Sequence, residues 1–148
     1  MKTRKRSGKR HPQSNALLDF LDWAFDIASW HGPNLAGSIR GLRAEDAAWA
    51  PSGRKGIWQQ TLHAAYWKQR VLNKLIGTQS FPRAGSNWPK LPADHTQVNW
   101  KRDVELLHEI HRQLRAAVAS MLSRDHEPDP KLQRIIAGIA LHDVYHAG

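Results

Sequence analysis

Two histidines near the end of the sequence have the spacing of a metal-binding pair. In the segment His142-Asp143-Val144-Tyr145-His146 they lie four residues apart, so on a helix they share one face and can reach the same ion. On a helical wheel they fall on an arc of small and apolar residues: Leu132, Ile135, Gly138 and Ile139. Pairs with this spacing also arise by chance on surfaces, but their position on an apolar arc favours metal binding.

A firm site needs a third ligand, and His63 is the candidate. The densest apolar arc of the helix expected over residues 57–76 consists of Ile57, Trp58, Ala64, Ala65, Leu72 and Leu75. His63 lies away from this arc, beside Gln59, Gln60, Trp67 and Arg70. Periodicity alone therefore leaves two interpretations open: His63 is a surface or groove histidine, or it is a metal ligand.

Three other polar residues could take part in chemistry. His111 lies in the middle of an apolar seam, where a buried histidine satisfied by one hydrogen bond is the common explanation; a fourth ligand or a base beside the metal is the alternative. Asp143 lies about 100° round the helix from His142, and we expect it to be solvated rather than to orient a ligand. His31 either lines a pocket or ends a helix, and Trp67 is a candidate pocket wall.

The elements that must position these side chains are all predicted to be helices. Helical periodicity covers residues 16–29, 57–76, 98–123 and 131 to the end, with a short helical piece over 34–41. Residues 43–56 are predicted to form a loop, and residues 78–97, which contain three prolines, form a long crossover between the second and third long helices. An all-α four-helix bundle is expected, an architecture that places metal sites in its interior.

Composition limits the remaining possibilities. The 148 residues suit one domain, and with no cysteine the chain has neither disulfides nor thiolate ligands. Six of the 22 basic residues lie in the first ten positions and all 13 acidic residues come later, so the rest carries a formal charge of only +3. We expect residues 1–14 to be a disordered basic tail, solvated rather than bound to nucleic acid or a membrane, and residues 15–148 to be the domain.

No apolar run approaches the length of a membrane span, about 20 residues, and no secretory segment follows the basic start. A cytoplasmic protein is therefore expected.

Three stretches resemble the DinB-like superfamily of bacterial metal-binding four-helix bundles, which includes the YfiT-type hydrolases. They are residues 30–35 (Trp-His-Gly-Pro-Asn-Leu) with 47–51 (Ala-Ala-Trp-Ala-Pro), residues 57–67, and residues 138–148, which are the most specific. The resemblance implies a site for zinc, nickel or a similar ion held by His63, His142 and His146, and it decides in favour of His63. His111 falls where related sequences often have histidine, although the metal triad does not require it, and a homodimer is implied as well.

The sequence departs from the family pattern at its end. Related chains usually continue with Gln-Ile and further helix, whereas here His146 lies in the expected last turn, where a helix can fray and a bound ion would help to hold it.

A three-histidine site leaves one position open, either for water that becomes a hydrolytic nucleophile or for a low-molecular-weight thiol that is transferred to an electrophile. The resemblance favours the second. The alternative is a non-catalytic bundle that binds metal or a small ligand, with a tail that contacts nucleic acid; no recognition helix in the sequence supports specific nucleic-acid binding.

Overall fold

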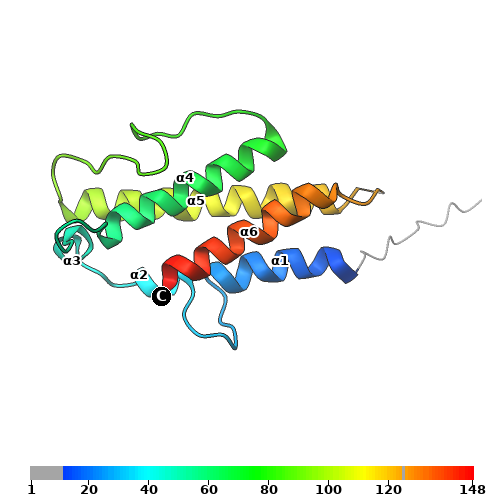
Figure 1. Ribbon diagram of the computed structural model, residues 1–148, viewed down its shortest axis with the longest axis horizontal. Helices are drawn as coiled ribbons and strands as arrows, with labels where there is room; N and C mark the ends of the chain where they lie inside the picture. Colours follow the sequence, from blue (N-terminus) through cyan, green and yellow to red (C-terminus); the bar gives the residue numbers. More distant parts are fainter. Residues whose placement is uncertain (1–11, 125) are drawn as a thin grey trace, which may run out of the picture.

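The computed structural model describes residues 12–124 and 126–148, and within them the regular structure is helical apart from one isolated bridge between Ser29 and Gly32 (Figure 1). Four helices are long: α1 (Pro12–Phe25), α4 (Ile57–Ile76), α5 (Gln97–Leu122) and α6 (Pro130–Ala147). Two are short: α2 (Leu35–Ile39) and α3 (Ala44–Ala48). The all-α prediction is confirmed.

The predicted boundaries hold best where capping signals are strong. Helix α4 spans the predicted residues and ends at Gly77, whose positive φ of 97° suits a residue without a side chain. Helix α6 begins one residue early because Asp129 caps the backbone N–H of Lys131 and Pro130 fits the first turn.

Two predictions differ from the structure by more than two residues. Helix α1 begins at Pro12 and ends at Phe25, so residues 12–14, which were assigned to the tail, are helical; the predicted tail otherwise lies outside the described residues. Proline suits the first helical position because it lacks the backbone N–H, which would have no intrahelical acceptor there, and this explains the earlier start. The loop predicted over 43–56 contains α3, where Ala44 and Ala47 are buried and Glu45 and Asp46 lie in the first turn, a favourable place for negative charge.

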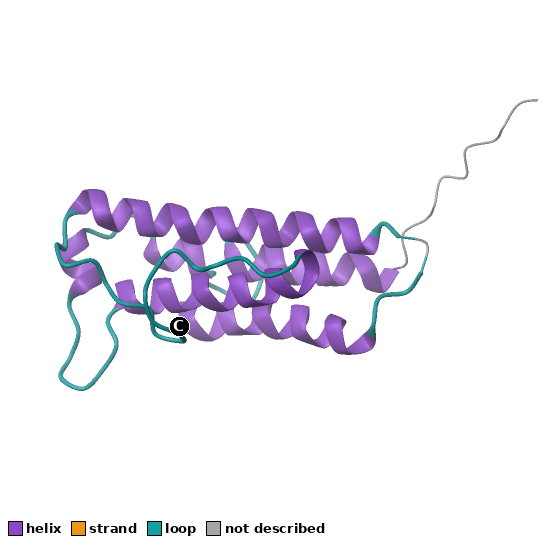
Figure 2. Cartoon of the chain, turned by 90° about the horizontal axis from the view of Figure 1, so that it is seen from above, coloured by secondary structure: helices purple, strands orange, loops and turns teal. Residues whose placement is uncertain are grey.

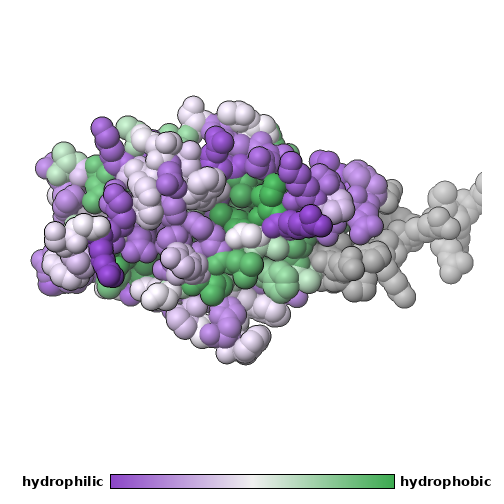
Figure 3. All heavy atoms as spheres, in the orientation of Figure 1, coloured by the Kyte–Doolittle hydropathy of each residue, from purple (hydrophilic) through white to green (hydrophobic). Residues whose placement is uncertain are grey.

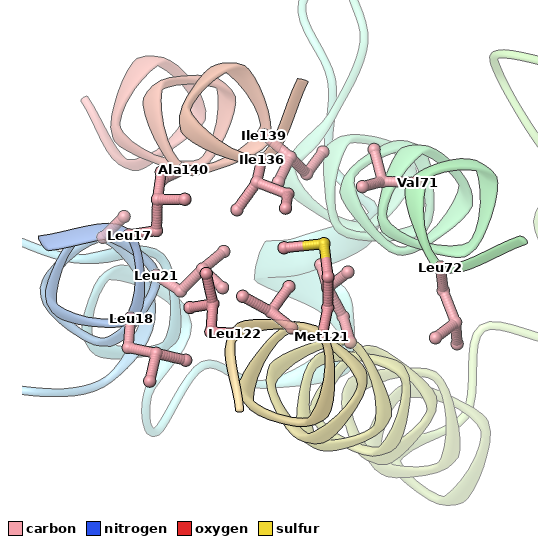
Figure 4. Packing of buried hydrophobic residues seen from close by; sticks show 13 residues of the cluster. Leu17, Leu18, Leu21, Val71, Leu72, Met121, Leu122, Ile136, Ile139 and Ala140 are labelled. Atoms are coloured by element: carbon pink, nitrogen blue, oxygen red, sulfur yellow. The ribbon is translucent and has the colours of Figure 1, made fainter. Parts of the chain in front are cut away.

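The four long helices lie side by side, with α4 against α5 and α6, and α1 against α5 and α6, while α2 and α3 cover one end (Figures 1 and 2). Two apolar clusters hold them together. The first joins α1, α4, α5 and α6 (Figure 4); its larger members are Leu17, Leu18, Leu21, Leu72, Leu114, Met121, Leu122, Ile136 and Ile139. The second lies under α2 and α3, around Phe25, Leu35, Ile39, Trp58, Leu62, Trp100 and Leu107.

The crossover over residues 77–96 runs along α4 and is anchored to α5 (Figure 1). Its Arg83 pairs with Asp103, whose side chain is fully buried and also accepts a 2.9 Å hydrogen bond from Trp58 Nε1. A buried carboxylate is costly unless it is paired and hydrogen-bonded, so these contacts stabilise one path for the crossover.

The face of the molecule seen in Figure 3 is largely hydrophilic, with hydrophobic side chains gathered near the middle of its length. Among the described helices none has the length and hydropathy to cross a membrane.

Candidate metal centre

Three histidines from two distant segments converge on one point. His63 lies in the second turn of α4, and His142 and His146 lie in the last turns of α6. One ring nitrogen from each lies within 4.8 Å of the others, and the two Nε2 atoms of His63 and His142 are 3.1 Å apart. His63 is buried and the other two are half-buried. The three histidines therefore lie close enough to hold one metal ion.

The spacing of the His63 and His142 nitrogens suits two ligands of a tetrahedral ion. Zn–N bonds of about 2.0–2.1 Å at tetrahedral angles separate two ligand nitrogens by about 3.3 Å, near the observed 3.1 Å between His63 and His142. Two lone pairs facing each other at this distance repel, so either a proton on one nitrogen or a cation between them is needed. The donor set, three imidazoles with no thiolate, suits zinc, nickel or copper better than magnesium or calcium.

On two of the three rings a hydrogen bond at Nδ1 places the ring hydrogen there and leaves Nε2 unprotonated, with its lone pair available to a metal. His63 Nδ1 donates to the backbone carbonyl of Asn87 at 2.6 Å, and His146 Nδ1 lies 3.2 Å from Gln60 Oε1. A ligating histidine usually donates its other ring N–H in this way, which sets the tautomer and the ring orientation. His142 Nδ1 is buried and has no partner within the described part of the chain.

The three rings favour the neutral form that a metal requires. Burial lowers the pKa of His142 to about 4, and the neighbouring His146, His63 and Lys68 add to this effect. Burial also lowers the pKa of His63, against the opposing hydrogen bond to Asn87, and it lowers that of His146 together with the nearby His63. Near neutral pH the three rings are therefore already neutral and do not have to lose a proton before an ion binds.

The end of α6 is tethered where fraying was expected. Ser38, in α2, donates its hydroxyl hydrogen to the backbone carbonyl of Ala147 at 2.8 Å. Carbonyls in the last turn of a helix lack intrahelical donors, so this bond satisfies one of them and holds the last turn of α6, which carries His146, against α2.

The crossover explains why His63 is buried although it lies off the apolar arc of α4. Trp88 stacks on the His63 ring with centroids 4.0 Å apart and planes 15° from parallel. His63 is 6% exposed, whereas Trp67, one turn along the same side of the helix, is 38% exposed. Periodicity within α4 carries no information about a segment that packs onto it from elsewhere in the chain.

A buried charged cluster lies between α4, α5 and α6. The ammonium group of Lys68 pairs with Asp143 and lies 3.1 Å from His111 Nδ1. Lys68 and Asp143 are both fully buried, so the expectation that Asp143 is solvated is wrong. Burial raises the pKa of Asp143 to about 6, although Lys68 opposes this shift.

The sequence contains a signal for this cluster that was missed. Lys68 follows Ala64 and Ala65 and precedes Leu72 on the apolar arc of α4. Asp143 follows Ile139 and Ala140 in the same way on α6. A basic residue on one apolar arc and an acidic residue on another indicate a buried pair, because neither is stable alone in a core. Gly138, which the helical wheel placed on the apolar arc of α6, is exposed, and a side chain there would meet open space.

His111 lies outside the converging group. It is 3% exposed, stacks on Phe25 with centroids 3.8 Å apart, and accepts a hydrogen bond from Lys68 at Nδ1. Its proton is therefore on Nε2, which is buried without a partner in the described residues. Burial lowers the pKa of His111 to about 2, and the positive charge of Lys68 adds to this effect, so the ring is a weak base.

His111 should make the protein sensitive to acid. Above the ordinary pKa of 6.5 the ring is neutral in both states, but below it the unfolded chain takes up a proton that the folded protein does not. The free energy of unfolding should therefore decrease as the pH is lowered below 6.5. At pH 4.5 this residue alone should account for a loss of about 3 kcal/mol. In His111→Gln, whose side-chain oxygen can still accept from Lys68, the loss between pH 7.5 and 4.5 should be smaller by that amount. Urea unfolding with a chelator present measures it, and equal losses in both proteins would contradict the assignment.

The residues suggested as a pocket do not lie together in the pocket beside the metal centre. A cavity of about 210 Å³ adjoins His146 and is lined by Leu35, Ser38, Ile39, Ile57, Gln60 and Thr61 with the end of the chain. His31 is exposed in the connection after α1, His111 is enclosed by Lys68 and Phe25, and Trp67 donates its Nε1 hydrogen to Asn87 Oδ1 at 2.9 Å. The lining side chains are apolar or uncharged, including His146 in its neutral form, which suits a small uncharged group.

Comparison of the chain with models of protein families, with curated proteins and with solved structures found no match.

Proposed function

We propose that the chain is a DinB-like four-helix bundle that binds one divalent ion, zinc or nickel, through His63, His142 and His146. The observation that supports this most is the convergence of the three ring nitrogens, two of them on rings whose Nδ1 atoms have acceptors. Hydrogen bonds at Nδ1 are what a ligating histidine needs, and packing alone gives no reason for three such rings to face one point. The motifs in residues 30–35, 47–51, 57–67 and 138–148 support the family assignment.

We infer further that the protein is a metal-dependent enzyme, either a thiol S-transferase or a hydrolase. A bound ion with three protein ligands has one open position, where it can activate a water or thiol or polarise a substrate carbonyl. The chain itself contributes orientation and shape. Asn87 and Gln60 orient two of the rings, Trp88 covers His63, and the cavity beside His146 offers a neutral place for a small substrate.

Metal analysis of the purified full-length chain tests the first part. It should contain about one zinc or nickel ion per chain, and protein stripped with a chelator should regain one equivalent on titration. Because an ion that binds only the folded state stabilises it, the unfolding midpoint should rise as the ion is added. Protein that takes up no ion and shows no such rise would contradict the proposal.

A substrate screen on the metal-loaded protein tests the second part. A transferase should consume a low-molecular-weight thiol and an electrophile together, whereas a hydrolase should cleave an ester without thiol. Metal-stripped protein is the control for both reactions. A loaded protein that is inactive in the whole screen would indicate the non-catalytic metal-binding alternative.

A further inference from the structure

Asn87, in the crossover, has an unusual backbone conformation. Its φ of 58° is the one positive value among the described residues other than glycine. Asparagine tolerates this left-handed region better than most residues, whereas a β-branched side chain is strongly disfavoured there. Such conformations persist where the surroundings stabilise them, and they often occur at functional sites.

Several contacts hold this part of the crossover in place. The side-chain oxygen of Asn87 accepts the Nε1 hydrogen of Trp67 at 2.9 Å. The segment closes on itself through a 2.9 Å hydrogen bond from Lys90 N to the carbonyl of Ala84, and Pro89 is buried. Asn87 is therefore tied to α4 by its side chain and to its own loop by the backbone around it.

This conformation brings two groups onto His63 together. The backbone carbonyl of Asn87 accepts from His63 Nδ1 at 2.6 Å, and the next residue, Trp88, stacks on the ring at 4.0 Å. The carbonyl selects the tautomer with hydrogen on Nδ1, and the indole fixes the plane of the ring. Rotation of the Asn87 peptide would move both groups at once, because the carbonyl and the following residue share that backbone.

We propose that Asn87 is a positioning residue for the metal centre: its left-handed backbone holds His63 as the Nδ1–H tautomer, with Nε2 directed at His142. The crossover is then part of the metal site, although it supplies no ligand. The effect on metal affinity rests on the proposed metal site. The effect on the tautomer concerns the metal-free protein and can be tested separately.

Two substitutions separate the backbone conformation from the side chain. Asn87→Val disfavours positive φ and removes the oxygen that accepts from Trp67. Asn87→Gly also removes that oxygen but permits positive φ readily. Trp67→Phe, a third variant, removes the Nε1 donor and leaves position 87 unchanged.

The first measurement is the affinity for zinc, from competition with a chromophoric chelator. Loss of a partner that orients a ligating histidine typically weakens binding by about 10–100-fold, and we expect this for Asn87→Val. Asn87→Gly and Trp67→Phe should remain closer to the wild type than Asn87→Val does. Thermal unfolding in excess chelator checks that each variant is folded at the temperature used.

The second measurement is nitrogen NMR of the imidazole rings in metal-free protein. The wild-type spectrum should show His63 with its hydrogen on Nδ1, and Asn87→Val should shift the tautomer population towards Nε2–H. A wild-type His63 with hydrogen on Nε2 would overturn the proposal, as would equal zinc affinity in Asn87→Val and the wild type, or equal weakening in Asn87→Gly and Asn87→Val. If the wild type binds no zinc, the proposed function fails while the tautomer result still stands or falls independently.

Discussion

Replacing His142 with alanine is expected to weaken binding of zinc or nickel by more than about a hundredfold. Structural zinc sites with four ligands have apparent binding free energies of about 10–16 kcal/mol, so each ligand accounts for about 3 kcal/mol, or somewhat over a hundredfold in affinity. His142 is the ring whose Nε2 lies 3.1 Å from that of His63, and it lies one turn from His146. Without it, two nitrogens remain, fewer than a firm site needs.

Isothermal titration of chelator-treated protein measures this loss, and metal content after purification gives an independent value. The matched control is His126→Ala, which removes an exposed histidine in the connection between α5 and α6. That variant should bind like the wild type. Unchanged metal content in His142→Ala would exclude the site.

The parts of this centre that a sequence reveals are those within one helix. The four-residue spacing of His142 and His146 determines that they share a face, whatever packs around it. His63 is different, because its burial depends on Trp88 and Asn87, which reach it from a segment without regular periodicity. The tether from Ser38 to Ala147 joins residues 109 apart in sequence, and spacing cannot reveal it.

The fold shows the same division. Helices α4 and α5 follow from their apolar periodicity and their ends, and both lie within a residue of the prediction. The short α3 has only five residues, too few for periodicity to distinguish it from a loop, and it is stabilised by the burial of Ala44 and Ala47. On α6 the buried face is centred on Ile136, Ala140 and Asp143, rotated from the arc that was predicted, because the wheel treated Asp143 as polar and therefore exposed.

Replacing Lys68 with methionine is expected to lower the free energy of unfolding by about 3–5 kcal/mol. Methionine keeps much of the volume of lysine but leaves the fully buried Asp143 carboxylate without its cation. Breaking a buried ion pair from one side typically costs about this much, a large part of the roughly 5–15 kcal/mol by which small proteins are stable. The double variant Lys68→Met, Asp143→Leu should recover most of the loss, because replacing a whole buried pair by apolar side chains is often neutral.

Urea unfolding at pH 7.5 in excess chelator measures these differences free of any contribution from metal. The control is Lys74→Met, an exposed position on the same helix, which should change stability little. A loss in Lys68→Met no larger than in this control, or a double variant as unstable as the single one, would show that the pair is not coupled as its contacts indicate.

The same pair has a consequence for the metal centre. Lys68 lies five residues after His63, and Asp143 is next to His142, so their bond fixes how α4 and α6 lie against each other at the level of the histidines. A double variant that regains stability but binds zinc more weakly would show that the charged pair aligns the two helices for the ligands. One that regains both would show that apolar packing of α4 against α6 is sufficient to bring the three rings together.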